Sequence, residues 1–446
     1  MGVSDVIEPK ESSATHSAEA NRDVLPGYKR TEAGVIPDDW IVSSVGSEFK
    51  VQLGKMLDAA RNIGIRRPYI GNRSVQWGRF DLQDLAEVPM TPADLKRFRL
   101  RRNDLLVCEG GEIGRAAVWN DAIPECYYQK ALHRLRPKKG YDVFLMMSFL
   151  YMWASSGYLG NYVTQTSIAH LPKDKLEVVP LPVPSPAEQR AIAESLADMD
   201  QSLTALEALI AKKRAIKQAT MQQLLTGKTR LLGFSGEWKS ATMAQIGSIY
   251  GGLSGKSKAD FGMGSAQYVP FLNVLENVTV DSSQLDWVYV GPGESQNRVL
   301  SGDLLFNGTS ETPEDLAMCS VVEESIPNLY LNSFCFGFRI EDRRKYDGLF
   351  LAYFFRGTPG RDLVYALAQG ATRHNLSKTQ FLALETSMPE PNEQRGIARV
   401  LSDMDAEISA VEARRDKTRS IKQGMIQHLL TGQIRLVKPQ ASESNS

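Results

Sequence analysis

The stretch that decides the fold begins with Glu188-Gln189-Arg190 and ends with Leu224-Leu225-Thr226-Gly227. It returns 205 positions later, from Glu393-Gln394-Arg395 to Leu429-Leu430-Thr431-Gly432, without a gap. About two dozen of the 44 positions from Glu188 to Leu231 are identical in the second copy. Shared helical composition would not give this agreement, so the chain contains an internal duplication.

Both copies have the apolar spacing of a long helix that packs against another helix. Their apolar residues recur in alternating steps of four and three, which is the heptad pattern of a coiled coil. These residues are Ile192, Leu196, Met199, Leu203, Leu206 and Ile210 in the first copy and Ile397, Leu401, Met404, Ile408 and Val411 in the second. We expect the two helices to pair with each other in antiparallel fashion. The alternative is that each is a core helix of its own duplicated domain.

The helix boundaries carry their own signals. Ser185 and Pro186 with Glu188 form a capping box with proline at the first helical position. Gly227 and Gly432 supply the stop at the other end. Each helix is therefore expected to span about 40 residues, or about 60 Å at 1.5 Å per residue.

The segments outside the helices have a different pattern, with short β-rich runs broken by Gly, Pro and Asn. We predict strands at 105–107, 116–119, 176–179, 269–272, 304–306 and 336–340, and helices at 141–158 and 346–357. Each segment is thus an α/β (α+β) domain. The chain as a whole is two such domains separated by the two long repeated helices, related by a pseudo-twofold internal repeat.

The predicted domain boundaries follow from these patterns. They are a disordered leader at 1–24, a first α/β domain at 25–184, a central repeat helix at 185–231, a second α/β domain at 232–389, a C-terminal repeat helix at 390–436 and a disordered tail at 437–446.

Composition excludes several classes of protein. The chain has 446 residues, 42% of them hydrophobic and 23% charged, which is typical of folded multidomain proteins. No run of about 18 apolar residues is present, so no membrane partner is expected. The four cysteines at 108, 126, 319 and 335 are dispersed, which argues against a metal or redox site and fits the reducing cytoplasm.

Charge is zero overall but unevenly distributed. From Lys50 to Lys139 there are 18 Lys or Arg against 10 Asp or Glu, a balance of +8. From Leu232 to Glu390 there are 12 against 18, a balance of −6. The first domain can attract a phosphate backbone, whereas the second has no such field of its own.

No catalytic motif is complete in this sequence. Gly251–Ser257 resembles a phosphate-binding loop but lacks the required glycine spacing. An Asn/Asp-Pro-Pro-aromatic methyltransferase motif is absent, as is a nuclease arrangement of carboxylates and lysine. The repeated acids Asp200 and Asp405 lie on the predicted helices, where solvated or partner-facing charges are favoured over a metal site. We therefore predict a protein that is not an enzyme and holds no cofactor.

Residues that can read base edges cluster in both domains. Such readout uses Arg, Lys, Asn or Gln on loops, supported by aromatic side chains. The candidates in the first domain are Lys55, Arg66, Arg67, Asn72, Arg73, Gln76, Trp77 and Arg115. Those in the second are Lys256, Lys258, Asn273, Asn277, Arg373, His374 and Asn375.

The arrangement resembles HsdS, the specificity subunit of type I restriction–modification systems. The resemblance is carried by the paired Pro-x-Glu-Gln-Arg-x-Ile-Ala starts at 186 and 391, the Leu-x-Asp-Met-Asp that follows, and the paired Leu-Leu-Thr-Gly-x-x-Arg-Leu ends. Asp104-Leu105-Leu106 leading to Gly111–Arg115 is similar to a loop of the family's target-recognition domains.

The resemblance implies a function and a set of partners. Two target-recognition domains would each read half of a bipartite double-stranded DNA site, with the coiled coil fixing the spacing. Two methylation subunits would dock on the helices, carry the S-adenosylmethionine and methylate adenine N6, and a restriction/translocase subunit would complete the complex. The alternatives are the specificity subunit of a type IIB-like restriction–methylation enzyme and a coiled-coil adaptor that binds no DNA.

Overall fold

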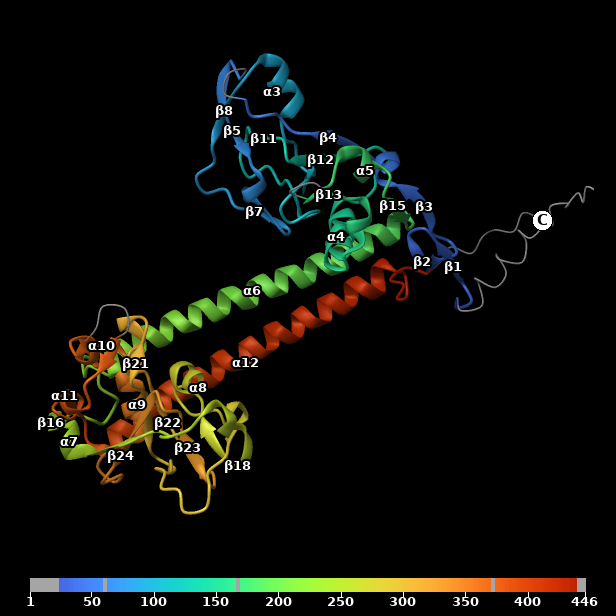
Figure 1. The fold of residues 1–446 in the computed structure, drawn as a ribbon. Helices are drawn as coiled ribbons and strands as arrows, with labels where there is room; N and C mark the ends of the chain where they lie inside the picture. The colour runs from blue at the N-terminus through green and yellow to red at the C-terminus, as the bar shows by residue number, and fades with distance from the viewer. Residues whose placement is uncertain (1–23, 59–61, 166–168, 370–373, 439–446) are drawn as a thin grey trace, which may run out of the picture. The chain divides into compact units, whose positions relative to one another are not determined.

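The structure is a computed structural model that describes residues 24–58, 62–165, 169–369 and 374–438 (Figure 1). The chain divides into two compact units. The first contains the residues up to 205 together with those from 415 onward, and the second contains residues 206–414. The two long helices contribute residues to both units. The predicted leader and tail lie almost wholly outside the described residues and stay predictions.

Two long helices form where the repeat predicts them. Helix α6 spans Pro186–Leu224 and helix α12 spans Pro391–Leu430. Gly227 and Gly432 follow the helix ends with φ of 69° and 68°, the left-handed region that glycine adopts without strain. The duplicated sequence therefore encodes two helices of nearly equal length, and the prediction is confirmed.

The two helices pair in antiparallel fashion within each unit. In the second unit Lys213 Nζ lies 2.6 Å from Glu407 Oε2, and Lys217 Nζ lies 2.5 Å from Asp405 Oδ1. Numbers rise along one helix as they fall along the other, which is the antiparallel order. In the first unit Lys422 makes the equivalent contact, 2.5 Å from Asp200 Oδ1. The repeated acids are thus engaged by lysines of this same chain.

The first unit is built on an antiparallel sheet with the strand order β10-β9-β12-β4. These strands are β10 (Ala116–Val118), β9 (Leu105–Cys108), β12 (Leu132–Pro137) and β4 (Phe49–Leu53). A second sheet has the order β11-β5-β8, with β11 (Tyr127–Tyr128), β5 (Ile65–Ile70) and β8 (Glu87–Met90). Strand β15 (Pro180–Val183) pairs with β3 (Ile41–Ser44) just before α6 begins.

The second unit repeats this topology strand for strand. Its four-stranded sheet has the order β17-β24-β20-β22, its three-stranded sheet the order β19-β18-β23. The strands are β17 (Gly247–Gly251), β24 (Cys335–Ile340), β20 (Leu304–Asn307), β22 (Cys319–Val321), β19 (Asp286–Val288), β18 (Phe261–Val269) and β23 (Leu329–Leu331). Strand β27 (Glu385–Met388) pairs with β16 (Lys239–Thr242) before α12. The duplication therefore includes the domains, although their sequences have diverged.

Each unit joins its sheet to the long helices through one apolar core. In the first unit α4 (Val143–Ser155) packs in the core that also holds Ile192 and Leu196 of α6 and Leu429 of α12. In the second, α9 (Gly348–Arg356) shares its core with Ile397 and Leu401. The heptad residues near the start of each helix therefore pack in the domain core as well as in the helix pair. Both interpretations of the repeat, a helix pair and a core helix in each domain, are partly correct.

Two of the strand predictions are wrong. Residues 176–179 were expected as a strand from their paired valines, but α5 (Lys173–Glu177) forms there and β15 starts only at Pro180. The expected strand at 269–272 is interrupted by Pro270, since β18 ends at Val269 and α8 (Phe271–Glu276) begins directly after the proline. Proline has no N–H for a ladder but suits the start of a helix.

A tyrosine of each unit contacts the helix pair at its Lys–Asp contact. In the second unit the Tyr353 hydroxyl donates to Asp405 Oδ2 at 2.7 Å, and Lys217 Nζ lies 5.4 Å from the centre of the Tyr353 ring. In the first unit Lys422 Nζ lies 5.8 Å from the Tyr151 ring. The tyrosine is thus one of the contacts that attach each domain to the helices.

We expect Tyr353→Phe to destabilise the second unit by about 1 kcal/mol. The variant removes one hydrogen bond to a carboxylate that is partly exposed, which limits its contribution. Urea denaturation followed by far-UV circular dichroism measures the change. Tyr151→Phe is the matched control, because its ring contact with Lys422 does not need the hydroxyl, and equal losses in both variants would contradict the assignment.

Candidate nucleic-acid interface

In the first unit, two loops and a short hairpin come together beside the four-stranded sheet. The loop between β9 and β10 contains Gly110, which bridges to His170 in β14 (Ala169–His170). The backbone N–H of Leu171 donates to the carbonyl of Glu109 at 2.8 Å. His170 and Leu171 are therefore brought against the loop that follows β9.

The predicted readers Asn72, Trp77 and Arg115 form one network on this surface. Asn72 Nδ2 donates to the carbonyl of Gly110 at 3.0 Å, and Arg115 Nη2 donates to the carbonyl of Asn72 at 3.0 Å. Glu112 accepts from both sides, with Trp77 Nε1 at 2.5 Å from Oε1 and Arg115 Nη1 at 3.2 Å from Oε2. Sequence spacing alone gave no reason to place Glu112 here. The network fixes the 71–78 and 109–115 loops to each other.

A pocket of about 610 Å³ opens beside this network. Trp77, Glu112 and Tyr151 line it together with Gly111 and Gly157, and the Trp77 and Tyr151 rings meet edge to face at 5.1 Å. The combination offers aromatic faces, a carboxylate acceptor and glycines that let another backbone approach closely. Such a surface can contact base edges and sugars, as well as phosphates through nearby cations.

The second unit builds the equivalent surface from strands. The loop after β20 forms β21 (Thr309–Ser310), which pairs with β26 (His374–Leu376), and β26 pairs in turn with β25 (Ala368–Gln369). His374 and Asn375, both predicted readers, therefore lie beside Thr309 and Ser310. Arg373 is outside the described residues, and its role stays a prediction. Thr309 and Ser310 were not among the predicted readers.

Several predicted cations are exposed. The side chain of Arg66 is 69% exposed and lies 3.7 Å from Glu87. Arg73 and Lys258 are also exposed. Arg67 is only partly exposed, with its Nε 3.2 Å from Glu125 Oε2. Gln76 donates to the carbonyl of Arg73 at 2.9 Å and so supports that turn.

Two predicted readers, Lys55 and Lys256, each follow a glycine and form ion pairs inside their own domains. Lys55 lies 3.0 Å from Asp94 and its side chain is 11% exposed. Lys256 donates to the carbonyl of Tyr289 and to Glu294, both at 2.6 Å, and its side chain is 6% exposed. The hydrogen bond from Lys256 lowers the pKa of Glu294 to about 2. These contacts favour a structural role over a phosphate contact for both lysines.

Asn273 and Asn277 hold a turn together. Asn273 is buried, its amide donates to the carbonyl of Asp281 at 2.8 Å and its oxygen accepts from Asp281 N–H at 3.0 Å. Asn277 donates to the same oxygen at 3.2 Å. The burial leaves the Asn273 side chain out of reach of a ligand in this structure, so we do not retain it as a reader.

Both domains contain the sequence Asp-Leu-Leu, beginning at Asp104 and at Asp303, and its aspartate has a structural role in each. Asp104 accepts two hydrogen bonds from Arg136, at 2.6 and 2.7 Å. Asp303 accepts likewise from Arg339, at 2.9 and 2.7 Å, and also from the Tyr250 hydroxyl at 2.7 Å. Each buried aspartate anchors the strand that leads into the reading loop. The motif marks the position of that loop, and its aspartate is engaged inside the domain.

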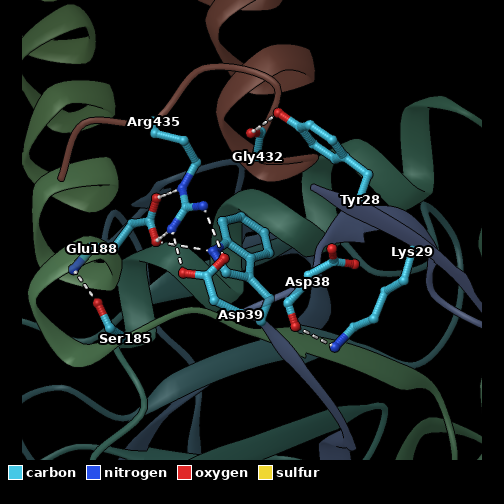
Figure 2. A network of polar contacts seen from close by, with 9 residues as sticks. Tyr28, Lys29, Asp38, Asp39, Ser185, Glu188, Gly432 and Arg435 are labelled. Carbon is cyan, nitrogen blue, oxygen red and sulfur yellow. Dashed lines mark hydrogen bonds and ion pairs between the residues drawn. The ribbon is translucent and has the colours of Figure 1, made fainter. Parts of the chain in front are cut away.

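An arginine after α12 links both ends of the first unit (Figure 2). Arg435 contacts Glu188 at 2.5 and 2.9 Å and Asp39 at 2.9 and 2.7 Å. Trp40 Nε1 donates to Glu188 at 2.9 Å, and the Tyr28 hydroxyl donates to the carbonyl of Gly432 at 2.9 Å. In the second unit Arg230 pairs in the same way with Glu393. These contacts fix the start of each domain to the helix that precedes or follows it.

The described residues contain neither a membrane-spanning helix nor a metal-binding cluster. No helix among them is both long enough and apolar enough to cross a membrane. Within the same part of the chain, no group of three or more His, Cys, Asp or Glu side chains is placed to hold a metal ion.

Comparisons with known proteins all give similarity to specificity subunits of type I restriction–modification systems. Residues 37–218 match the family described as "Type I restriction modification DNA specificity domain". The MjaX type I restriction enzyme specificity subunit of Methanocaldococcus jannaschii is 21% identical over 430 residues, covering 92% of this chain and 97% of that protein. The S subunit of a type I restriction–modification system from M. genitalium has a similar fold, with a TM-score of 0.54, 14% identity and coverage of 88% and 96%. A chain from a study of type I R-M complex assembly and conformational transition aligns with a TM-score of 0.58, 12% identity and coverage of 90% and 99%.

Proposed function

From these similarities we propose that the chain is a specificity subunit of the type I restriction–modification family and that it reads a bipartite DNA target. The coarser part of the proposal is recognition of DNA sequence by a subunit that is not catalytic, which the matching family and relatives support. The proposal adds that each unit reads one half of the target and that the α6–α12 pair sets the distance between the halves. It also places the protein in the cytoplasm.

One observation carries this proposal. The same two-sheet module occurs twice in one chain, with equivalent strands but different loops at the equivalent place. The first module presents Asn72, Trp77 and Arg115, whereas the second presents Thr309 and Ser310 beside β26. Two unlike readers on one repeated framework suit an asymmetric target, because a homodimer of one reader would require a palindrome.

We further propose that two methylation subunits dock on the repeated helices. The repeat supplies two equivalent helix surfaces, which suits two copies of one partner. Those subunits would bring the S-adenosylmethionine and transfer its methyl group to adenine N6 within the target. A restriction/translocase subunit would join the same complex.

Methylome sequencing tests the proposal. Expression of the chain together with its methylation subunit in a host without other methyltransferases should give one new bipartite motif that contains N6-methyladenine. Expression of either protein alone should give none. A host genome without a new motif, despite soluble co-purifying proteins, would reject the proposal.

Exchange of the first domain tests its modular part. Replacing residues 25–184 with the corresponding domain of a relative should change one half of the methylated motif and leave the other half and the spacer unchanged. The reason is that each module carries its own sheets and its own loops. Sequencing the methylome of the hybrid measures the outcome, and a hybrid that changes both halves or neither would contradict independent reading.

A further inference from the structure

The loop that follows β20 in the second unit is held by two side chains of the same unit, a half-buried arginine and a fully buried asparagine. Arg361, in α10 (Thr358–Tyr365), donates through Nη2 to the carbonyls of Glu314 at 2.8 Å and Leu316 at 2.6 Å. The same nitrogen reaches the carbonyl of Pro313 at 3.5 Å. Asn307, which is fully buried at the end of β20, donates to the carbonyls of Thr309 at 3.2 Å and Asp315 at 2.7 Å.

Five carbonyls of one short loop therefore accept from two internal side chains. Backbone carbonyls of an irregular loop need such partners, because a buried carbonyl without a donor is costly. The loop is also paired on its other edge, where the N–H of Leu376 donates to the carbonyl of Gly308 at 3.0 Å. Its path between β20 and β22 is thus fixed on both sides, with Thr309 and Ser310 placed in β21.

The charge on Arg361 has no carboxylate among its hydrogen-bond partners. Its bonds run to backbone oxygens, and desolvation by burial lowers the pKa of its guanidinium. Nη1 is buried without a hydrogen-bond partner among the described residues, so the hydrogen bonds that offset the desolvation all run from Nη2 to this loop. The position is therefore unlike that of an arginine in a surface ion pair, and its observed effect is to fix the loop.

The first unit holds its equivalent loop differently. There Cys108 stands where Asn307 stands in the second unit, and the loop is held by Asn72, Trp77 and Arg115 on the candidate interface. In the first unit the groups that support the loop are themselves candidates for DNA contact. In the second unit the support comes from Asn307 and Arg361, which are not among the candidates for DNA contact.

We propose that Arg361 is a positioning residue that determines specificity for the half-site read by the second unit, without contacting DNA. The inference rests on the proposed function, in which β21 and its neighbours read that half. Hydrogen bonding of bases depends on placement to within a few tenths of an ångström, so a loosened loop should accept more than one base at the positions it reads.

Arg361→Met is the test, because methionine keeps an unbranched, though shorter, side chain and removes every donor. The variant is expressed as the full chain with its methylation subunit, and the methylome is sequenced. We expect degeneracy at positions of one half-site only, with discrimination against a substituted base falling about tenfold. The other half-site and the spacer should keep their wild-type sequence and so serve as an internal control.

Further variants separate positioning from simple stabilisation. Arg361→Lys keeps the charge with a single donor group and should give an intermediate loss of discrimination. Arg343→Met, at an exposed arginine of the same unit, should leave the motif unchanged. If Arg361→Met does not accumulate as a folded complex, the lysine variant carries the same test.

The outcomes distinguish this inference from the proposed function. A wild-type chain that yields no bipartite motif would reject the proposed function. A wild-type motif that persists in Arg361→Met and Arg361→Lys with unchanged discrimination, even at lower methylation yield, would overturn the positioning role alone. Degeneracy spread over both half-sites would overturn it as well.

Discussion

Replacing Arg435 with methionine is expected to lower the free energy of unfolding of the first unit by about 3 kcal/mol. The variant leaves the buried carboxylate of Glu188 without its cation, and removing one partner of a buried ion pair costs about 3–5 kcal/mol. We take the lower end of that range because the Arg435 side chain is 20% exposed. Urea denaturation measures the change, with the fluorescence of Trp40 as a local probe because its indole contacts Glu188.

Arg190→Met is the matched control for this variant. Arg190 is an exposed arginine two residues from Glu188 on the same helix, so its replacement should change stability little. Adding Glu188→Gln to Arg435→Met should recover part of the loss, since a neutral amide does not need a cation. Equal destabilisation by the Arg190 and Arg435 variants would contradict the role assigned to this contact.

The same contact predicts a dependence on pH. A hydrogen bond from Arg435 and its charge lower the pKa of Asp39 below the ordinary value. A carboxyl group with a lowered pKa in the folded state contributes stability that is present above about pH 3.9 and is lost as the pH falls through the lowered value. Stability curves measured between pH 6 and pH 3 should therefore fall more steeply for the wild type than for Arg435→Met.

The sequence was sufficient to predict the elements that depend on periodic or local signals. The heptads and the capping residues gave α6 and α12 to within a few residues, and Asp-Leu-Leu correctly marked β9 and β20. Val178 and Val179 gave a false strand because a β-branched pair is only a weak signal. Pro270 was the better guide at its position, since proline cannot donate within a ladder.

The candidate interface could be predicted only in part, because it depends on contacts between segments far apart in the sequence. Trp77 and Arg115 meet through Glu112, and Arg115 also bonds the carbonyl of Asn72. No local pattern links residues that lie about 40 positions apart. Lys256 carried the expected chemistry but is engaged by Glu294. Net charge was informative in sign for each half. It could not show which cations point inward, as Arg361 does.

The repeated helices give the second prediction of large effect, a change in the spacer of the target. Inserting one heptad in both helices at the same level of the pair should lengthen it by about 10.5 Å, since each helical residue adds 1.5 Å. B-DNA rises about 3.4 Å per base pair, so the spacer of the methylated motif should grow by about three base pairs. A whole heptad keeps the same faces in contact, which a four-residue insertion would not.

The contacts of the second unit define where the insertions belong. Lys213 faces Glu407 and Arg214 faces Glu412, so heptads placed after Ile210 and after Glu412 lie at one level. The lengthened chain should methylate the motif with the longer spacer, and its affinity for the original target should fall toward the non-specific level, by about 10³-fold or more. A heptad added after Lys438 is the control for the extra residues. An unchanged spacer in the double insertion would show that the helix pair does not set the distance between half-sites, whereas altered half-sites would show that the modules are not independent of the helices.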